Sequence, residues 1–367
     1  MIVILALVAG TLLAFANGAN DNFKGVATLY GSGTTSYRHA LLWATLTTGL
    51  GSIMAVWFAR DLLARFSGKG IVPETLAAQN EFGVSVALAA GVTVILASRI
   101  GFPISTTHAL VGSMVGTSTA SSSAINWSVL TSKMLVPLLL SPVIAIAATA
   151  SIYLLFRKTR LALGVSKETC FFAGQEIIET WTVCGDANAR AKELSISLGT
   201  TVSCRNHYAG SLLGFDANRV LDVLHFLSAG MVSFARGLND TPKIAALLLI
   251  IPAFNSLTAT LTCGIAIALG GWLGARKTAE KLSHGITEMN AGQGFSANLV
   301  TSVLVVFASR WGLPVSTTHV SCGALFGVGS TTGQAHWKSI GQILLAWITT
   351  LPFAALISWI TFKTLSL

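Results

Sequence analysis

Phe15-Ala-Asn-Gly-Ala-Asn-Asp-Asn-Phe-Lys24 recurs later in the chain as Phe234-Ala-Arg-Gly-Leu-Asn-Asp-Thr-Pro-Lys243. A second segment, Arg99-Ile-Gly-Phe-Pro-Ile-Ser-Thr-Thr-His108, recurs as Arg310-Trp-Gly-Leu-Pro-Val-Ser-Thr-Thr-His319. Chance matches between apolar segments would repeat Leu and Val, not Asn-Asp and Pro-x-Ser-Thr-Thr-His. The order of the two motifs is the same in both copies, so the chain is built from two homologous halves.

The sequence around these motifs is strongly apolar. Of 367 residues, 53% are hydrophobic and 10% are charged, and the mean hydropathy is +0.70. A soluble domain carries about 25% charged residues, so most of this chain's surface must face lipid. Seven stretches are apolar enough to predict membrane helices, two of them rather short: Ile2–Ala16, Ala40–Phe58, Val84–Ala97, Val129–Phe156, Asn255–Leu273, Ala297–Ala308 and Ile340–Phe362. Ile2–Ala16 has no basic residue before it, which favours a retained helix over a signal peptide.

Basic residues outnumber acidic ones by 23 to 14, but this excess does not predict nucleic-acid binding. Residues such as Arg38, Arg60, Arg157 and Lys277 lie at the ends of apolar stretches, where their side chains reach the headgroups. The five cysteines show no paired spacing and predict no disulfide framework.

The domain organisation predicted is a first transmembrane repeat over 1–156, a soluble central insert over 157–220 and a second transmembrane repeat over 221–367. The insert is richer in charge, and alternation such as Leu194-Ser-Ile-Ser-Leu198 indicates short β elements. Its cysteines, Cys170, Cys184 and Cys204, fit no familiar zinc spacing. The fold predicted is an all-α integral membrane protein whose halves are inverted repeats. The number of crossings per half stays open.

Asp21 and Asp240 are carboxylates inside apolar sequence, where each costs at least ~2.5 kcal/mol on insertion scales. Each follows an asparagine, Asn20 or Asn239, and a nearby glycine. This composition predicts a broken helix at both sites. One explanation for the carboxylates is a structural ion pair with the lysine three residues on. The alternative that we favour is a cation site for Na⁺ at Asp21 and Asp240, with Asn20 and Asn239 adjoining.

The second motif predicts a helix start that binds an anion. A proline and a glycine interrupt the chain, and Ser-Thr-Thr then begins a helix, whose free N–H groups attract negative charge. Capping needs only one of the three hydroxyls, whereas the whole set recurs. The predicted substrate-binding residues are Ser105, Thr106, Thr107, Ser316, Thr317, Thr318, Asp21 and Asp240. For His108 and His319, a hydrogen bond to a nearby carbonyl is favoured over proton relay.

Together these residues predict cation-coupled transport of a tetrahedral oxyanion by alternating access. Neutral donors bind the anion, and cations at the carboxylates balance its charge. Monohydrogen phosphate has a proton to donate to a carboxylate and sulfate has none, which favours phosphate. A sulfate permease of the same fold is the alternative.

The motifs resemble those of the PiT family of inorganic phosphate transporters. Gly18–Asp21 and Pro103–His108 match its two signatures, and Gly237–Asp240 and Pro314–His319 are the second-half copies. The resemblance implies Na⁺- or H⁺-coupled phosphate uptake, an inverted-repeat fold, a homodimer and a multi-pass protein of the cell membrane with a cytoplasmic insert. It implies no other cofactor. The residues after Asp21 and Asp240 depart from the family pattern, which leaves the coupling ion open.

Two other classes of protein fit the sequence less well. A hydrolase would need an acid oriented beside Ser105 and His108, and the sequence offers none next to them. A receptor or scaffold would not require two aspartates inside the membrane. We therefore expect a transporter and no enzyme activity.

Overall fold

The computed structural model describes residues 2–68, 70–165, 169–179, 190–200 and 214–367, without the side chains of residues 170–218. The chain divides into two units, of which one comprises residues 1–153 and 225–367 and the other residues 154–224. The larger unit contains both copies of the repeated motifs.

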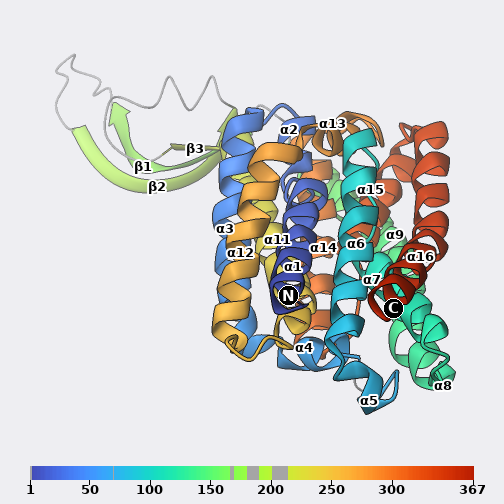
Figure 1. Ribbon diagram of the computed structural model, residues 1–367. Helices are drawn as coiled ribbons and strands as arrows, with labels where there is room; N and C mark the ends of the chain where they lie inside the picture. Colours follow the sequence, from blue (N-terminus) through green and yellow to red (C-terminus); the bar gives the residue numbers. More distant parts are fainter. Residues whose placement is uncertain (1, 69, 166–168, 180–189, 201–213) are drawn as a thin grey trace, which may run out of the picture. The chain divides into compact units, whose positions relative to one another are not determined.

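The first half of the chain is helical (Figure 1). Its elements are α1 (Ile2–Asp21), α2 (Ala27–Gly31), α3 (Tyr37–Phe58), α4 (Arg60–Phe66), α5 (Glu74–Ala77), α6 (Asn80–Ile100), α7 (Thr106–Ala120), α8 (Trp127–Leu130), the π-helical turn η1 (Thr131–Leu135) and α9 (Val136–Ala162). Helix α1 packs between α6 and α12, so the first motif lies inside the helical unit.

The second half is helical as well. Its elements are α11 (Ala217–Leu248), α12 (Ser256–Gly274), α13 (Arg276–His284), α14 (Ala291–Arg310), α15 (Thr317–Thr332) and α16 (Trp337–Leu365). Helix α15 packs against α14, and α7 packs against α6 and α16. The Ser-Thr-Thr motifs thus begin two helices that other helices surround.

Seven helical segments within the described residues are long and apolar enough to cross a membrane. They are Ile2–Asp21, Tyr37–Phe58, Asn80–Ile100, Trp127–Ala162, Ser256–Gly274, Ala291–Arg310 and Trp337–Leu365. Each overlaps one of the seven apolar stretches of the sequence, and the predicted helical membrane protein is confirmed. Helices α6 and α14 are longer than the apolar stretches Val84–Ala97 and Ala297–Ala308, which they exceed at both ends.

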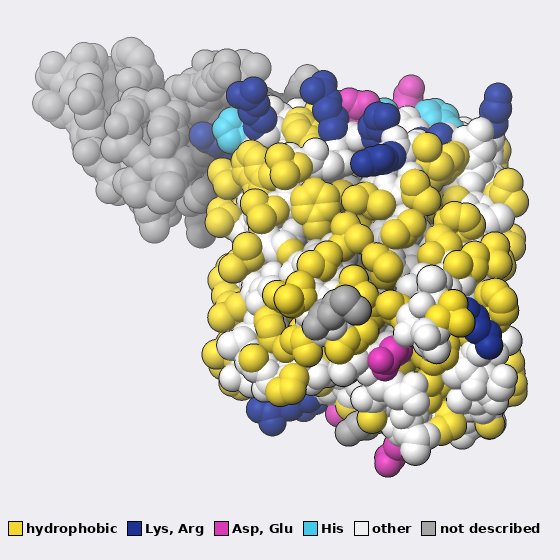
Figure 2. Space-filling model, viewed as in Figure 1, with side chains coloured by type: hydrophobic (Ala, Val, Ile, Leu, Met, Phe, Trp, Pro, Cys, Tyr) yellow, Lys and Arg dark blue, Asp and Glu magenta, His cyan; other side chains and the backbone are white. Residues whose placement is uncertain are grey.

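The surface of the larger unit has the polarity of a membrane protein. Figure 2 shows hydrophobic side chains over the middle of one face, with most Lys and Arg side chains toward its two ends. Large apolar residues such as Leu46, Leu345 and Ile348 are exposed. Lipid tails solvate such a surface and water does not.

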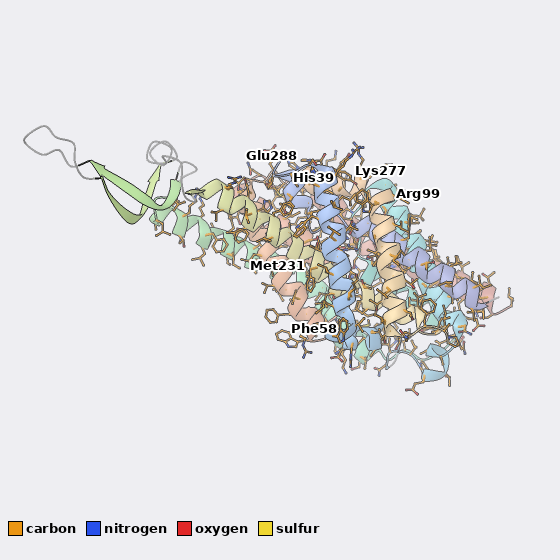
Figure 3. The ribbon with its side chains drawn as sticks, turned by 90° about the vertical axis from the view of Figure 1, so that its left-hand side faces the viewer. His39, Phe58, Arg99, Met231, Lys277 and Glu288 are labelled. Atoms are coloured by element: carbon orange, nitrogen blue, oxygen red, sulfur yellow. The ribbon has the colours of Figure 1, made fainter. Side chains whose placement is uncertain are left out.

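Helices α6 and α14, which precede the two Ser-Thr-Thr motifs, run in opposite directions. Arg99, at the end of α6, lies at the same end of the unit as Glu288, just before α14 begins (Figure 3). His39 and Lys277 lie at that end too, Met231 lies between the ends, and Phe58 lies toward the opposite end. Antiparallel matching helices are what an inverted repeat requires. The inverted repeat itself stays a prediction.

Three of the four predicted chain breaks are present. Helix α1 ends at Asp21, and α6 and α14 end just before Gly101 and Gly312. These two glycines have φ of 80° and 65°, a left-handed conformation that side chains with a Cβ rarely adopt. The glycine turns before Ser-Thr-Thr are therefore confirmed.

The predicted break at Asp240 is wrong. Helix α11 continues from Ala217 to Leu248 through Asn239, Asp240 and Pro242. Proline removes only one helical N–H, and neighbouring groups inside a helical membrane protein can satisfy the carbonyl that it leaves free. The helix-favouring residues Ala245–Leu248 then continue the helix.

The glycines of the first motif allow very close helix contacts. A Cβ added at Gly18 of α1 would collide with the carbonyl oxygen of Ile267 in α12. A Cβ added at Gly237 of α11 would collide in the same way with the carbonyl oxygen of Thr48 in α3. Small residues at such crossings let two helix backbones touch within a membrane. The glycine of each motif copy thus allows one close helix pair, and both pairs join a helix of the first half to a helix of the second.

The smaller unit contains a three-stranded antiparallel sheet of order β2-β1-β3. The strands are β1 (Thr169–Glu179), β2 (Arg190–Thr200) and β3 (Gly214–Asp216), and Thr169 pairs with Thr200 while Glu179 pairs with Arg190. Strand β2 includes Leu194–Leu198. The side chains of Cys170, Cys184 and Cys204, whose spacing argued against a zinc site, lie outside the described residues.

Candidate functional site

The carboxylate of Asp21 ends α1 and is almost fully buried. It forms an ion pair with Lys24 through Oδ1. Its Oδ2 accepts hydrogen bonds from Nδ2 of Asn17 at 3.0 Å and from the hydroxyl of Thr106 at 3.3 Å. Because Thr106 is the first residue of α7, the carboxylate joins the first motif to the second within one half.

Asp240 has an equivalent environment in the second half. Its Oδ1 lies 3.2 Å from Nζ of Lys243. Its Oδ2 accepts a hydrogen bond from Thr317, the first residue of α15, at 3.0 Å. Both lysine pairings that the sequence suggested are therefore present. The unbroken α11 thus presents its carboxylate to a lysine and a threonine that correspond to those around Asp21 at the end of α1.

Each lysine also crosses to the other half of the chain. Lys24 donates to the hydroxyl of Thr318, and Lys243 donates to the hydroxyl of Thr107 at 2.8 Å. Lys24 also donates to the carbonyl of Ile104 at 3.2 Å, and Lys243 to that of Val315 at 2.8 Å. Ile104 and Val315 directly precede Ser105 and Ser316. The two halves therefore meet at their repeated motifs.

The asparagines next to the carboxylates hold the loops before Ser-Thr-Thr. Asn20 accepts a hydrogen bond from the N–H of Ile104 at 3.2 Å and donates to the carbonyl of Phe102 at 2.9 Å. Asn239 donates to the carbonyl of Val315 at 3.1 Å and to Oδ1 of Asp240 at 3.1 Å. Both amides satisfy backbone groups that the chain breaks leave unpaired.

Ser105 and Ser316 cap the two helix starts. Their hydroxyl oxygens accept hydrogen bonds from the N–H groups of His108 and His319, at 3.0 Å and 3.2 Å. The capping role is thus real for the two serines, but it leaves the four threonines to contact the carboxylates, lysines and carbonyls. All ten predicted site residues are buried in the larger unit: Asn20, Asp21, Ser105, Thr106, Thr107, Asn239, Asp240, Ser316, Thr317 and Thr318.

The two histidines lie against one another, with ring centroids 4.5 Å apart. Nδ1 of His319 lies 3.3 Å from the carbonyl of Leu138, in keeping with the carbonyl partner favoured from the sequence. In the described part of the chain, Nδ1 of His108 and Nε2 of His319 have no hydrogen-bond partner.

Arg236 is a site residue that sequence reasoning missed. Its guanidinium donates through Nη2 to Asn17 and through Nη1 to Asn22, both at 2.9 Å. Its Nε lies 3.9 Å from Oδ2 of Asp240 and has no hydrogen-bond partner among the described residues. A signal was present, because Arg236 is the position at which the second copy replaces Asn17 by a charge.

The site carries a net positive charge. Asp21, Lys24, Arg236, Asp240 and Lys243 are all the Asp, Glu, Lys and Arg side chains that are buried in the described residues. Three basic and two acidic groups give a formal charge of +1. Asp21 is 1% exposed and Asp240 3%, so the cluster is closed to solvent in this structure. An isolated buried charge is costly, which makes the cluster receptive to a single negative charge.

Comparison with known proteins supplies a further set of observations. The sequence profile of the "Phosphate transporter family" matches residues 17–358. A "Putative phosphate permease" from Pyrococcus furiosus is 28% identical, and the match covers 99% of this chain and 96% of that protein. Another putative phosphate permease, from Haemophilus influenzae, is 26% identical, with 98% and 96% covered. The solved structure of a protein described as "The sodium-dependent phosphate transporter" shares the fold with a TM-score of 0.76 at 23% identity, covering 100% of this chain and 99% of that one.

Proposed function

The chain belongs to the phosphate transporter family, and from this membership we propose that it carries inorganic phosphate across the cell membrane by cation-coupled symport. Membership in a family of transporters agrees with the sequence-based expectation that the chain is no enzyme. The observation that carries the proposal is the single buried cluster in which the two Asn-Asp motifs and the two Ser-Thr-Thr helix starts meet.

The helix starts supply the donors that a phosphate needs. The first turn of an α-helix has N–H groups without helical partners, and these point toward an anion together with the positive end of the dipole. The hydroxyls of Thr106, Thr107, Thr317 and Thr318 lie at two such starts. Phosphate would take the place of some of the contacts that these hydroxyls now make with carboxylates and carbonyls.

Alternating access is the mechanism that we propose. The cluster is closed to solvent, so a substrate can reach it only if surrounding helices move. The matching helices α6 and α14 run in opposite directions (Figure 3). This arrangement supports a movement in which the two halves exchange their conformations, so that the site opens first to one side of the membrane and then to the other.

The proposed coupling cation binds at Asp21 and Asp240, with Asn20 and Asn239 beside them. Sodium is the ion favoured from the sequence, and H⁺ is the other candidate. The structural relative is described as sodium-dependent, which supports sodium for that protein. We further propose that the chain forms a homodimer and that the insert is cytoplasmic, as the family resemblance implies.

The test is uptake of radiolabelled phosphate into proteoliposomes that contain the purified full-length chain. We expect uptake above that of empty liposomes when a Na⁺ or H⁺ gradient is imposed. Excess unlabelled phosphate should abolish the signal, and excess sulfate should leave most of it. Inhibition by sulfate that equals inhibition by phosphate would instead support a sulfate permease.

A further inference from the structure

The ammonium group of Lys24 occupies a shell of oxygen atoms. Its Nζ contacts Oδ1 of Asp21 and the hydroxyl of Thr318, and lies 3.3 Å from Oδ1 of Asn20 and 3.2 Å from the carbonyl of Ile104. Carboxylate, amide, hydroxyl and carbonyl oxygens are the ligands that proteins use for hard metal cations. An ammonium group has only three N–H bonds, so four oxygens exceed what it needs.

Lys243 lies in an equivalent shell. Its Nζ is 3.2 Å from Oδ1 of Asp240, 2.8 Å from the hydroxyl of Thr107 and 2.8 Å from the carbonyl of Val315. The carboxylate, the threonine hydroxyl and the carbonyl before the capping serine occur around both lysines. Repetition of the shell in both halves argues that each lysine has a role, beyond a local ion pair within one helix.

These oxygens are the ones that a sodium ion at Asp21 or Asp240 would use. A free cation could not share either shell with the ammonium group. Two unit charges 4 Å apart repel by about 4 kcal/mol at an effective dielectric constant of 20. Lys24 and Lys243 are buried, and their ammonium groups are covalently attached to the chain. Unlike Na⁺, these groups do not have to bind from solution to occupy the two shells.

We propose that Lys24 and Lys243 stand in the place of the coupling metal ions, so that phosphate transport by this chain needs no Na⁺ and is coupled to H⁺. The inference rests on the proposed function and narrows its coupling ion. A tethered cation cannot be released with the substrate, which leaves the proton as the ion that moves. When the dianion HPO₄²⁻ takes up one proton, it becomes the monoanion H₂PO₄⁻. The single negative charge of this monoanion balances the formal +1 of the cluster.

The first experiment compares driving forces on the intact protein. Proteoliposomes of the purified chain are given a pH gradient, acid outside, in choline buffer without Na⁺. A second set receives an inward Na⁺ gradient at equal pH, and a third receives neither. Phosphate uptake should be stimulated by the pH gradient at least tenfold over the third set and should be unaffected by Na⁺.

The outcomes separate the inference from the proposed function. Uptake that responds to Na⁺ and not to the pH gradient would overturn the role of the lysines and leave phosphate transport intact. Absence of phosphate uptake in all three sets would overturn the proposed function, and the inference with it.

The second experiment removes the tethered cations. The double substitution Lys24→Asn and Lys243→Asn shortens both side chains, removes both charges and adds an amide oxygen to each shell. Uptake by this variant should be stimulated at least tenfold by Na⁺. The matched control is Lys277→Asn, whose side chain is exposed at the end of the helical unit and whose substitution should leave uptake independent of Na⁺.

A readout that does not need transport accompanies it. Sodium should raise the thermal unfolding temperature of the double variant and not that of the unsubstituted protein or of the Lys277→Asn control, because a ligand stabilises only the protein that binds it. If Na⁺ raised the unfolding temperature of all three proteins equally, or of none of them, the proposal would be overturned. If the variant does not fold, the comparison of driving forces decides alone.

Discussion

The ammonium group of Lys243 donates a 2.8 Å hydrogen bond to the hydroxyl of Thr107, although the two residues come from different halves of the chain. Lys24 makes the corresponding bond to Thr318. Each half thus supplies a lysine to the helix start of the other. Neither half can form a complete site alone, and any movement that separates a lysine from the opposite helix start must break these bonds.

The aspartates are expected to be essential. Asp21→Asn and Asp240→Asn should each reduce phosphate uptake to the level of empty liposomes, because each leaves a buried lysine without its counter-charge. Folded protein should still be recovered by size-exclusion chromatography. Asp222→Asn, an exposed site on α11, is the control and should transport normally. Full uptake by both site variants would contradict the cation-site argument.

Loss of a threonine hydroxyl at a helix start should weaken phosphate binding. Thr107→Val keeps the shape of the side chain but removes the hydroxyl that, in the proposed function, donates a hydrogen bond to phosphate. A hydrogen bond to a charged group contributes about 1.5–3 kcal/mol, so we expect KM for phosphate to rise by roughly tenfold or more. Uptake kinetics in proteoliposomes measure this change. Thr119→Val, at an exposed position of the same helix, should leave KM unchanged.

Arg236 should contribute to anion affinity. Arg236→Gln removes the charge that makes the cluster positive and keeps a donor for one of the two asparagines. Phosphate affinity should fall by about tenfold, which corresponds to roughly 1.4 kcal/mol. Arg276→Gln, which removes an exposed arginine paired with Glu280, serves as the comparison. Identical KM values for the two variants would exclude a part for Arg236 in binding.

Close contacts at the motif glycines should matter for stability. Gly18→Ala and Gly237→Ala each place a methyl group against a backbone carbonyl of a neighbouring helix. Such overpacking costs about 1–3 kcal/mol, and the apparent melting temperature in detergent should fall. Gly49→Ala on α3 meets open space and should not lower it. Equal melting temperatures for the three variants would show that the helices can separate at little cost.

Much of the architecture could be predicted from the sequence because apolar length and a repeated motif are local signals. The seven apolar stretches and the turns at Gly101 and Gly312 needed no knowledge of distant contacts. The unbroken α11 was missed because helix continuation at Pro242 depends on neighbours that sequence spacing does not reveal.

The charge pattern of the site was harder to predict. Pairing of Lys24 with Asp21 follows from spacing along one segment, whereas its bond to Thr318 depends on how the two halves meet. Arg236 could have been noticed as a charge inside an apolar repeat. Its hydrogen bonds to Asn17 and Asn22 connect α11 to the region around the end of α1, far earlier in the chain, and appear only in the folded structure.

The direct backbone contacts at Gly18 and Gly237 limit which helices can move relative to one another during transport. At these crossings one helix backbone lies directly on another, with no flexible side chain between them. If one helix slid along the other by a single residue, the Cβ of the next residue would collide with a backbone carbonyl. Helices α1 and α12 must therefore move together as one rigid body, and so must α3 and α11. The hinges that open a path for the substrate lie elsewhere in the helical unit. Cross-linking the two helices of either pair should therefore leave phosphate uptake intact.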